Sequence, residues 1–444
     1  MSSIRFMRNI FCFSPRTGPL ALILIIAAGL VLSFQPPARA RVYLDITSPD
    51  LRKVPIAVPS FIAGEGSVAT PGLGSDLAGL MTRGLLLHGF VKALPASSYN
   101  DSQQADWTAA GADFVILGQY SAAPGSLVLE MRLLDILEGR AIFAKRFSGT
   151  PKQRQAMILK FCDEVILQLT GERGVSSTKI AYISDETGDK EIHIADVVGS
   201  NFRQVTRHHS MIASPRFSPD GSRLAYTSYH RDNANFYITD LAQSTTTRAI
   251  SRRKGLNLAP AWSPVDHELL VITLSMDGNP DLYLMTTTGA IRERLTENSG
   301  VNVSPDFSPD GQEVVFVSDR SGRPQLYIMD MRSRAVRRLT FQGTDNSEPA
   351  WSPKGDWIAY TGLLGGNYHL FMIRPQGGTP VPITRTAGDH EAPSWAPDGR
   401  QLVFARKFDD ERKICIINKN GSNMRVLFDL KGNQSSPRWS PRLD

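Results

Sequence analysis

A short motif that recurs six times at an almost constant interval constrains this chain more than any other feature. The motif reads Pro, any residue, Phe or Trp, Ser or Ala, then Pro, and three copies continue with Asp-Gly. The first prolines stand at 215, 260, 305, 349, 393 and 437, so successive copies lie 45 or 44 residues apart. A period of about 40–50 residues that contains several short strand patterns indicates the blades of a β-propeller.

Each interval contains the same order of expected strands. In the fourth copy these are 349–352, 357–361, 369–373 and 381–384, separated by turn residues. Proline cannot donate a hydrogen bond to a strand ladder, so the first strand is expected at a blade edge, lining the central channel. The aromatic residue of each motif is expected to be a buried wedge against the next blade, at positions 217, 262, 307, 351, 395 and 439.

The two ends of the repeat region predict how the ring closes. The segment 179–183 matches a second strand, and the chain stops after 438–441, which matches a first strand with nothing after it. These ends are expected to share one blade, which leaves no open sheet edge. The sequence therefore predicts a six-bladed β-propeller over 179–444, with both ends of the repeat region in the closing blade.

The N-terminus has the pattern of a secretory signal peptide. Arginines precede an uncharged apolar run from Leu20 to Leu32, and Ala38-Arg39-Ala40 follows. The run is too short to span a membrane, so residues 1–40 are expected to be cleaved after Ala40 on export. An uncleaved anchor is the alternative. The mature protein is then expected to be an exported monomer without a transmembrane segment.

Charge gives no indication of nucleic-acid binding. The whole chain has 49 Lys+Arg against 43 Asp+Glu, and removal of the four arginines in residues 1–40 leaves 45 against 43. A mature charge this close to zero does not favour a nucleic-acid partner. Of the three cysteines, Cys162 and Cys415 remain in the mature chain and are expected to be buried thiols without a disulfide.

Between the signal peptide and the propeller, residues 41–171 are expected to form a small α/β domain with an extended N-terminal tail, and 172–178 a linker. The two segments before its first helix are a strand or tail and a strand whose prolines suggest a sheet edge. Ser75 is the expected cap of the first helix, and Gly171 is expected to end the last. The expected strands are 42–46, 54–59, 114–118, 127–132 and 141–145, and the expected helices 76–88, 103–110 and 152–170.

A search for catalytic motifs assigns no catalytic, cofactor-binding or metal-binding residue. The chain has no G-x-S-x-G nucleophile elbow and no phosphate-binding loop. His208-His209 lacks partners at metal-ligand spacing, and Asp389-His390-Glu391 lies where the chain enters a first strand. Polar residues that vary at this position from blade to blade favour a binding face on a rigid scaffold. A rim substitution such as Glu348→Lys is expected to break no core contact.

The whole arrangement resembles the TolB family of Gram-negative bacteria. The resemblance is carried by the P-x-[FW]-S-P-D-G blades, by following segments such as "VVFVSDRSGRPQLYIMD" and "RRLT", by the preceding α/β domain and by the chain end at Trp439-Ser440-Pro441. It implies a non-enzymatic periplasmic scaffold of the Tol–Pal system, without a cofactor. Such a scaffold supports outer-membrane integrity and envelope constriction at cell division.

The resemblance also implies two partners and their sites. The lipoprotein Pal would bind the propeller through segments just before the first strands, and TolA would bind the mature N-terminal tail. Two blades depart from the family pattern, with Leu256 where a histidine is frequent and Ser304 where an acid is frequent. The tail starts with Arg41, where an acid is common. The matching Pal positions are Leu256, Asn257, Ala259, Asn302, Val303 and Ser304, with Glu348 and Glu391 in the next two blades, and the TolA positions are Arg41, Val42, Tyr43, Leu44 and Asp45.

Two other classes of function stay open from the sequence. A periplasmic propeller hydrolase or lyase would need a convergent acid–base or metal set in the channel. A glycan-binding module would need exposed aromatic side chains on the rim, whereas the repeated aromatics stand at the expected wedge positions.

Overall fold

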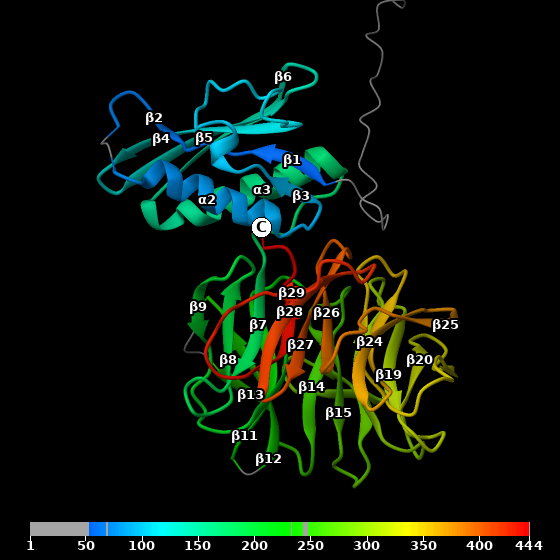
Figure 1. Cartoon of the computed structure of the whole chain (residues 1–444). Helices are drawn as coiled ribbons and strands as arrows, with labels where there is room; N and C mark the ends of the chain where they lie inside the picture. The colour runs from blue at the N-terminus through cyan, green and yellow to red at the C-terminus, as the bar shows by residue number, and fades with distance from the viewer. Residues whose placement is uncertain (1–52, 68–69, 232, 243–246, 444) are drawn as a thin grey trace, which may run out of the picture. The chain divides into compact units, whose positions relative to one another are not determined.

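The computed structural model describes residues 53–67, 70–231, 233–242 and 247–443 (Figure 1). The expected signal peptide, its cleavage site at Ala40 and the tail at 41–45 lie outside these residues. None of the helices in the described ranges is long and apolar enough to cross a membrane.

The N-terminal part is a mixed sheet with two helices on one face (Figure 1). The strand order is β3-β1-β4-β5-β6, and β2 pairs with β4. A short 3₁₀ helix, η1, is Ala96–Ser98, and another, η2, is Pro151–Gln153. The other elements are β1 Val54–Ala57, β2 Ile62–Ala63, α2 Leu73–Leu86, β3 Val91–Ala93, β4 Phe114–Ala123, β5 Ser126–Asp135, β6 Arg140–Gly149 and α3 Arg154–Thr170.

Three local predictions in this part are wrong. β1 is an interior strand, because it pairs in parallel with both β3 and β4. Pro55 fits there because it contributes its carbonyl, which accepts from Asp113, while the neighbouring Val54 N–H donates to Phe90. Helix α2 begins at Leu73 after Gly72, whose φ of 77° a glycine adopts without strain, so Ser75 lies inside the helix and is not its cap.

The third wrong prediction is the helix at 103–110, where the structure has turns. The side chain of Gln103 donates to the carbonyls of Ser60 and Gly118, and the Asp106 carboxylate accepts from the Ala109 N–H. These side-chain bonds compete with a helix, although the Ala110 N–H still donates to the Asp106 carbonyl with helical spacing. Helix α3 ends at Gly171 in the left-handed conformation, as predicted.

The propeller has six four-stranded antiparallel blades, as the repeat predicts. The blades are β10-β11-β12-β13, β14-β15-β16-β17, β18-β19-β20-β21, β22-β23-β24-β25, β26-β27-β28-β29 and β30-β7-β8-β9. In each, the strand that carries the motif is an edge strand. The last blade joins β30 from the end of the chain to β7, with Trp439 opposite Ile180, so the predicted ring closure is confirmed.

The strand bounds follow the 44- or 45-residue period. The first strands are β10 Ile212–Phe217, β14 Asn257–Trp262, β18 Asn302–Phe307, β22 Asn346–Trp351, β26 Asp389–Trp395 and β30 Gln434–Trp439. The second and third strands are β7 Lys179–Ser184, β8 Glu191–Asp196, β11 Arg223–Arg231, β12 Asn233–Asp240, β15 Leu269–Leu274, β16 Asp281–Thr286, β19 Glu313–Ser318, β20 Gln325–Asp330, β23 Ile358–Leu364, β24 Asn367–Arg374, β27 Gln401–Phe408 and β28 Glu411–Asn418. The outer strands are β9 Ser200–Gln204, β13 Thr247–Ser251, β17 Ile291–Arg294, β21 Val336–Arg338, β25 Gly377–Pro382 and β29 Arg425–Val426.

The motif aromatics lie between blades. Trp351 is 7% exposed and packs in one cluster with Val315 and Ile328 of the preceding blade and with Ile358 and Tyr360 of its own. Within the described residues, the thiols of Cys162 and Cys415 are free and buried, as expected.

Candidate functional site

The channel of the propeller has two mouths, which differ in how the chain reaches them. The first strands all run in the same direction, so one mouth, here the entry mouth, is where they begin, and the exit mouth is where they end. The segments predicted to bind Pal precede or open the first strands. They therefore gather around the entry mouth, because equivalent positions of a propeller lie on one face.

Every first strand has a β-bulge at the residue before its first proline. The register shifts at this point in all six blades. The bulged residues Ser214, Ser304, Glu348, Ala392 and Ser436 have φ between 49° and 55°, which non-glycine residues rarely adopt. The bulge bends the strand and redirects these side chains at the channel wall.

Two of the residues predicted to bind Pal are buried and form hydrogen bonds to the preceding blade. Asn257 and Asn302 have no exposed surface. Asn302 Nδ2 donates to Asp281 of the preceding blade and to the carbonyl of Gly300, and Asn257 Nδ2 donates to the carbonyl of Ala234. Leu256, Val303 and Ser304 are partly exposed, and Ala259 lies within β14.

The two glutamates predicted to bind Pal also have partners within the propeller. Glu348 Oε2 accepts from the Ala392 N–H at 2.7 Å and from Thr361 Oγ1 at 2.9 Å, which ties the bulge of one blade to that of the next. Glu391 pairs with Arg412 at 3.0 Å, and burial raises the pKa of its carboxyl. The expectation that Glu348→Lys breaks no core contact is therefore wrong, since it would remove the shorter of the two hydrogen bonds of the buried Ala392 N–H and leave only that to Thr361 Oγ1 at 3.2 Å.

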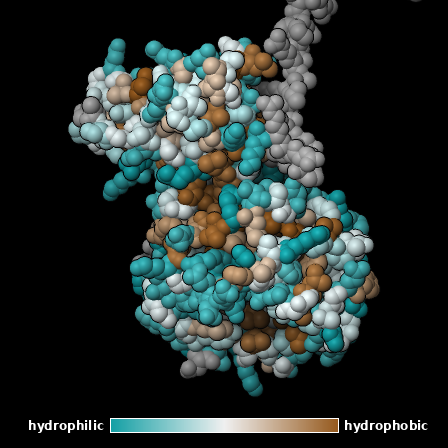
Figure 2. All heavy atoms as spheres, viewed as in Figure 1, coloured by the Kyte–Doolittle hydropathy of each residue, from teal (hydrophilic) through white to brown (hydrophobic). Residues whose placement is uncertain are grey.

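Apolar side chains that sequence reasoning missed are exposed at the rim of the entry mouth. Met211 is 48% exposed beside the start of β10, and Phe341 is 72% exposed in the loop before β22. Leu364 and Phe408 are 54% and 46% exposed at the ends of β23 and β27, which pair with the starts of β22 and β26. In Figure 2 the outer wall of the propeller is mostly hydrophilic, and hydrophobic side chains are visible at its lower end.

Histidines that drew attention in the sequence contact other side chains at this mouth. The ring of His208 lies 4.3 Å from that of His230, and both bond to Ser228 Oγ. His209 pairs with Asp189, and His390 is buried against His369. Within the described ranges no three His, Cys, Asp or Glu side chains are grouped in a way that could hold a metal ion.

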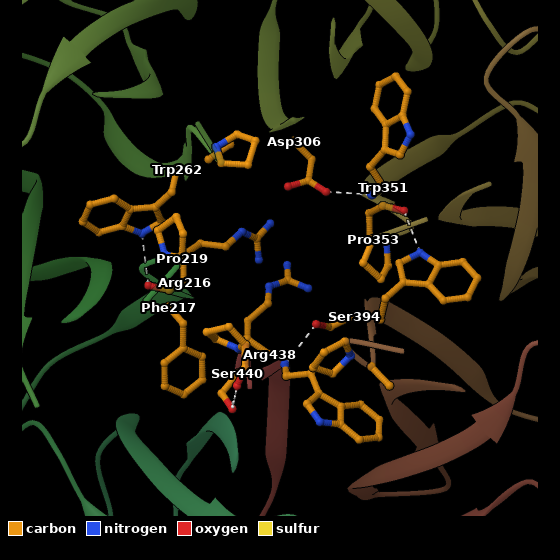
Figure 3. A pocket seen from close by; sticks show the side chains of 18 of the residues that line it. Arg216, Phe217, Pro219, Trp262, Asp306, Trp351, Pro353, Ser394, Arg438 and Ser440 are labelled. Atoms are coloured by element: carbon orange, nitrogen blue, oxygen red, sulfur yellow. Dashed lines mark hydrogen bonds between the residues drawn. The ribbon is translucent and has the colours of Figure 1, made fainter. Parts of the chain in front are cut away.

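Inside the channel, a cavity of about 540 Å³ lies toward the exit mouth (Figure 3). Its walls include motif tryptophans and second prolines, and its charged lining residues are Arg216, Asp306, Arg438 and Arg442. Figure 3 shows the first three of these side chains projecting into the cavity. Asp306 Oδ2 accepts from the Trp351 N–H at 2.7 Å. Burial raises the pKa of Asp306 from 3.8 to about 6, against the opposing effects of Arg216 and of the backbone hydrogen bonds.

This raised pKa predicts that Asp306 destabilises the fold at neutral and alkaline pH. Between about pH 4 and 6 the unfolded chain releases a proton that the folded chain retains, so the free energy of unfolding falls through this window, by at most about 3 kcal/mol. Asp306→Asn keeps an oxygen for the Trp351 N–H. We expect the free energy of unfolding of this variant in urea to exceed that of the wild type by about 1–3 kcal/mol at pH 8, and by about a third as much at pH 4.5.

Asp310→Asn is the matched control, because hydrogen bonds from Ser308 and from the Gln312 N–H lower the pKa of Asp310. Asp310→Asn is expected to lower the free energy of unfolding at pH 8, whereas Asp306→Asn is expected to raise it. A destabilising Asp306→Asn at pH 8, or an effect independent of pH, would contradict this account of Asp306.

Comparison with known proteins agrees with this fold. The family model described as "TolB beta propeller domain" matches residues 167–443, and "TolB amino-terminal domain" matches 42–142. A "Tol-Pal system protein TolB" of Desulfotalea psychrophila is 44% identical over 269 residues, 60% of this chain and 61% of the relative. The chain thus spans about three fifths of that relative.

Two further proteins match over more of the chain. The "Tol-Pal system protein TolB" of Bordetella pertussis is 33% identical over 312 residues, 69% of each protein. The crystal structure of TolB from Acinetobacter baumannii superposes with a TM-score of 0.77 at 28% identity, covering 88% of this chain and 97% of that one. With both family models matched in chain order and six blades closed by the chain end, this chain belongs to the TolB family of Tol–Pal system proteins.

Proposed function

We propose that this protein is a periplasmic scaffold that binds Pal at the entry mouth of the propeller and TolA through the tail at 41–45. In this role it supports outer-membrane integrity and envelope constriction at cell division. The observation that carries the Pal site is the group of apolar side chains Met211, Phe341, Leu364 and Phe408 on the entry rim. Exposed apolar side chains with polar neighbours are typical of protein-binding surfaces.

A rigid frame supports the same proposal. The asparagines at the strand entries and the Glu348 bond to the next blade hold the rim backbone in place. A preorganised surface loses little entropy on binding, so contacts made by the rim translate into affinity. The buried residues Asn257, Asn302 and Glu348 then act by positioning the rim, while Leu256, Val303 and the exposed apolar residues contact Pal.

The test is titration calorimetry of purified Pal against a triple variant, Met211→Ala, Phe341→Ala, Phe408→Ala. We expect its Kd to rise by about tenfold or more, because this needs a loss of only about 1.4 kcal/mol in total from truncating three large apolar side chains that the partner would bury. All three side chains are partly in solvent, so the circular dichroism spectrum and melting temperature should stay near those of the wild type.

Two matched controls locate the effect. Val265→Ala removes an apolar side chain that is 69% exposed at the turn after β14, on the exit mouth, and should leave Pal affinity unchanged. A variant lacking 41–45 should bind Pal as the wild type does and lose binding to TolA. Unchanged Pal affinity in the folded triple variant would refute the entry-mouth site.

A further inference from the structure

Two arginines project side by side into the channel on the blades that meet where the ring closes. Arg216 of β10 and Arg438 of β30 occupy the same motif position, between proline and the aromatic residue, and their strands are neighbours. Figure 3 shows both guanidinium groups pointing toward the middle of the cavity. The six residues at this position, in ring order, are Arg216, Ala261, Asp306, Ala350, Ser394 and Arg438.

Both guanidinium groups have donors left over. Arg438 is 9% exposed, and its Nη1 donates to the carbonyls of Pro393 and Pro437, but its buried Nε has no hydrogen-bond partner among the described residues. The buried Nη1 of Arg216 likewise has none there. Burying a charged donor without an acceptor costs free energy. The simplest reason for two such donors in one cavity is that the cavity binds a ligand with acceptor atoms.

The carboxylates nearby do not supply that acceptor. Asp306 lies on the opposite side of the ring from Arg438, and its Oδ2 is bonded to the Trp351 N–H. Glu348, which also contributes to the field at Arg216, has its Oε2 bonded to Thr361 and Ala392. In the part of the chain that is described, neither arginine forms an ion pair. The cavity lining also contains Arg442, whose guanidinium donates to the carbonyls of Gly174, Pro397 and Arg173, so three arginines line the cavity with one Asp carboxylate.

The shape and walls of the cavity restrict the ligand. Its volume of about 540 Å³ is within the range of small-molecule sites, and its tryptophan and proline walls lower the local dielectric, which strengthens charge interactions. Guanidinium groups match a carboxylate in geometry, through paired N–H donors. The excess of positive charge in the lining favours an anionic ligand.

We propose that this cavity binds a carboxylate between Arg216 and Arg438, with its oxygens accepting from Arg216 Nη1 and Arg438 Nε. The carboxylate comes either from a free small organic acid or from the C-terminus of a peptide. This site is separate from the entry rim, so its test does not depend on whether Pal binds there.

The test is calorimetric titration of the full mature protein with succinate at constant ionic strength in chloride buffer. We expect saturable binding at one site per chain. Arg216→Gln is the decisive variant, because the Arg216 side chain donates no hydrogen bond within the described residues and the fold should tolerate its loss. Its Kd should be about tenfold or more above that of the wild type, as for the loss of a charge-assisted pair.

Other variants separate the site from general charge effects. Arg332→Gln removes an exposed cation in the β20–β21 turn and should bind as the wild type does, whereas Asp306→Asn removes a repelling carboxylate and should bind more tightly. Arg438→Gln should also weaken binding if its melting temperature shows that it folds.

A tripeptide with a free C-terminus and the same tripeptide amidated identify the source. Binding of the acid and not of the amide assigns the site to a peptide end, and binding of succinate alone assigns it to a free acid. No saturable binding of succinate or the acid peptide to the wild type, equal binding of the amide, or wild-type affinity in Arg216→Gln would overturn the proposal.

Discussion

Replacing Trp351 by alanine is expected to lower the free energy of unfolding by about 3–5 kcal/mol. The ring is 7% exposed and packs between the blades β18–β21 and β22–β25. Its removal leaves a cavity between two sheets, and the cavity can shrink only as far as the two sheets can move together. Equilibrium urea unfolding measures the change. A loss under about 1 kcal/mol would mean that this wedge contributes little to blade packing.

Phenylalanine substitutions provide a sharper comparison within the same motif. Trp395 Nε1 donates to the Ala350 carbonyl at 2.9 Å, whereas the buried Trp351 Nε1 has no partner among the described residues. Both rings keep most of their packing as phenylalanine. Trp395→Phe should therefore cost about 1 kcal/mol more than Trp351→Phe, the net value of a hydrogen bond whose acceptor is left buried. Equal costs would show that the Trp395 bond does not stabilise the fold.

Removing the strand that closes the ring is expected to have the largest effect of all. A chain ending at Asn433 lacks β30, so β7 loses its inner partner and the last blade becomes an open three-stranded sheet. It also lacks Trp439, which is 6% exposed, packs with Ile180 and donates from Nε1 to Thr178. We expect a loss above about 5 kcal/mol, comparable with the whole stability of many domains.

A chain ending at Arg442 is the control, because it retains β30. It should show one cooperative transition near that of the full-length protein, while the chain ending at Asn433 should unfold broadly or aggregate through its open edge. If the shorter chain instead melted cooperatively at the same temperature, the shared blade would not be what closes the ring.

The period of the motif was enough to predict topology, because each repeat builds one blade and the unmatched ends at 179 and 441 leave one way to close the ring. Position within a strand was harder to predict. The bulge before each first proline depends on a positive φ, and neither serine nor alanine, the residue types at 214 and 392, indicates this conformation. Pro55 suggested that its strand lies at the edge of the sheet. An interior parallel strand nevertheless accommodates this proline, because the Pro55 carbonyl still accepts a hydrogen bond.

The position of the strand-entry residues around one mouth was predictable, but their exposure and contacts were not. Strand-entry residues do gather at one mouth, yet polarity suggested exposure where Asn257 and Asn302 are fully buried. Their amides bond to the preceding blade, a contact between residues about 20 positions apart that no local pattern reveals. The exposed Phe341 and Phe408 carry no motif, and the pairing of Arg216 with Arg438 appears only after the ring closes.

Backbone hydrogen exchange of this protein with and without Pal, followed by mass spectrometry, tests most directly whether the entry mouth is the docking face. The proposal predicts slower exchange on Pal binding in the segments 207–212, 252–258, 341–347 and 385–391, with no change at the exit-mouth turns 218–222, 308–312 and 352–356. Slower exchange confined to the exit-mouth turns or to residues 53–171 would contradict it.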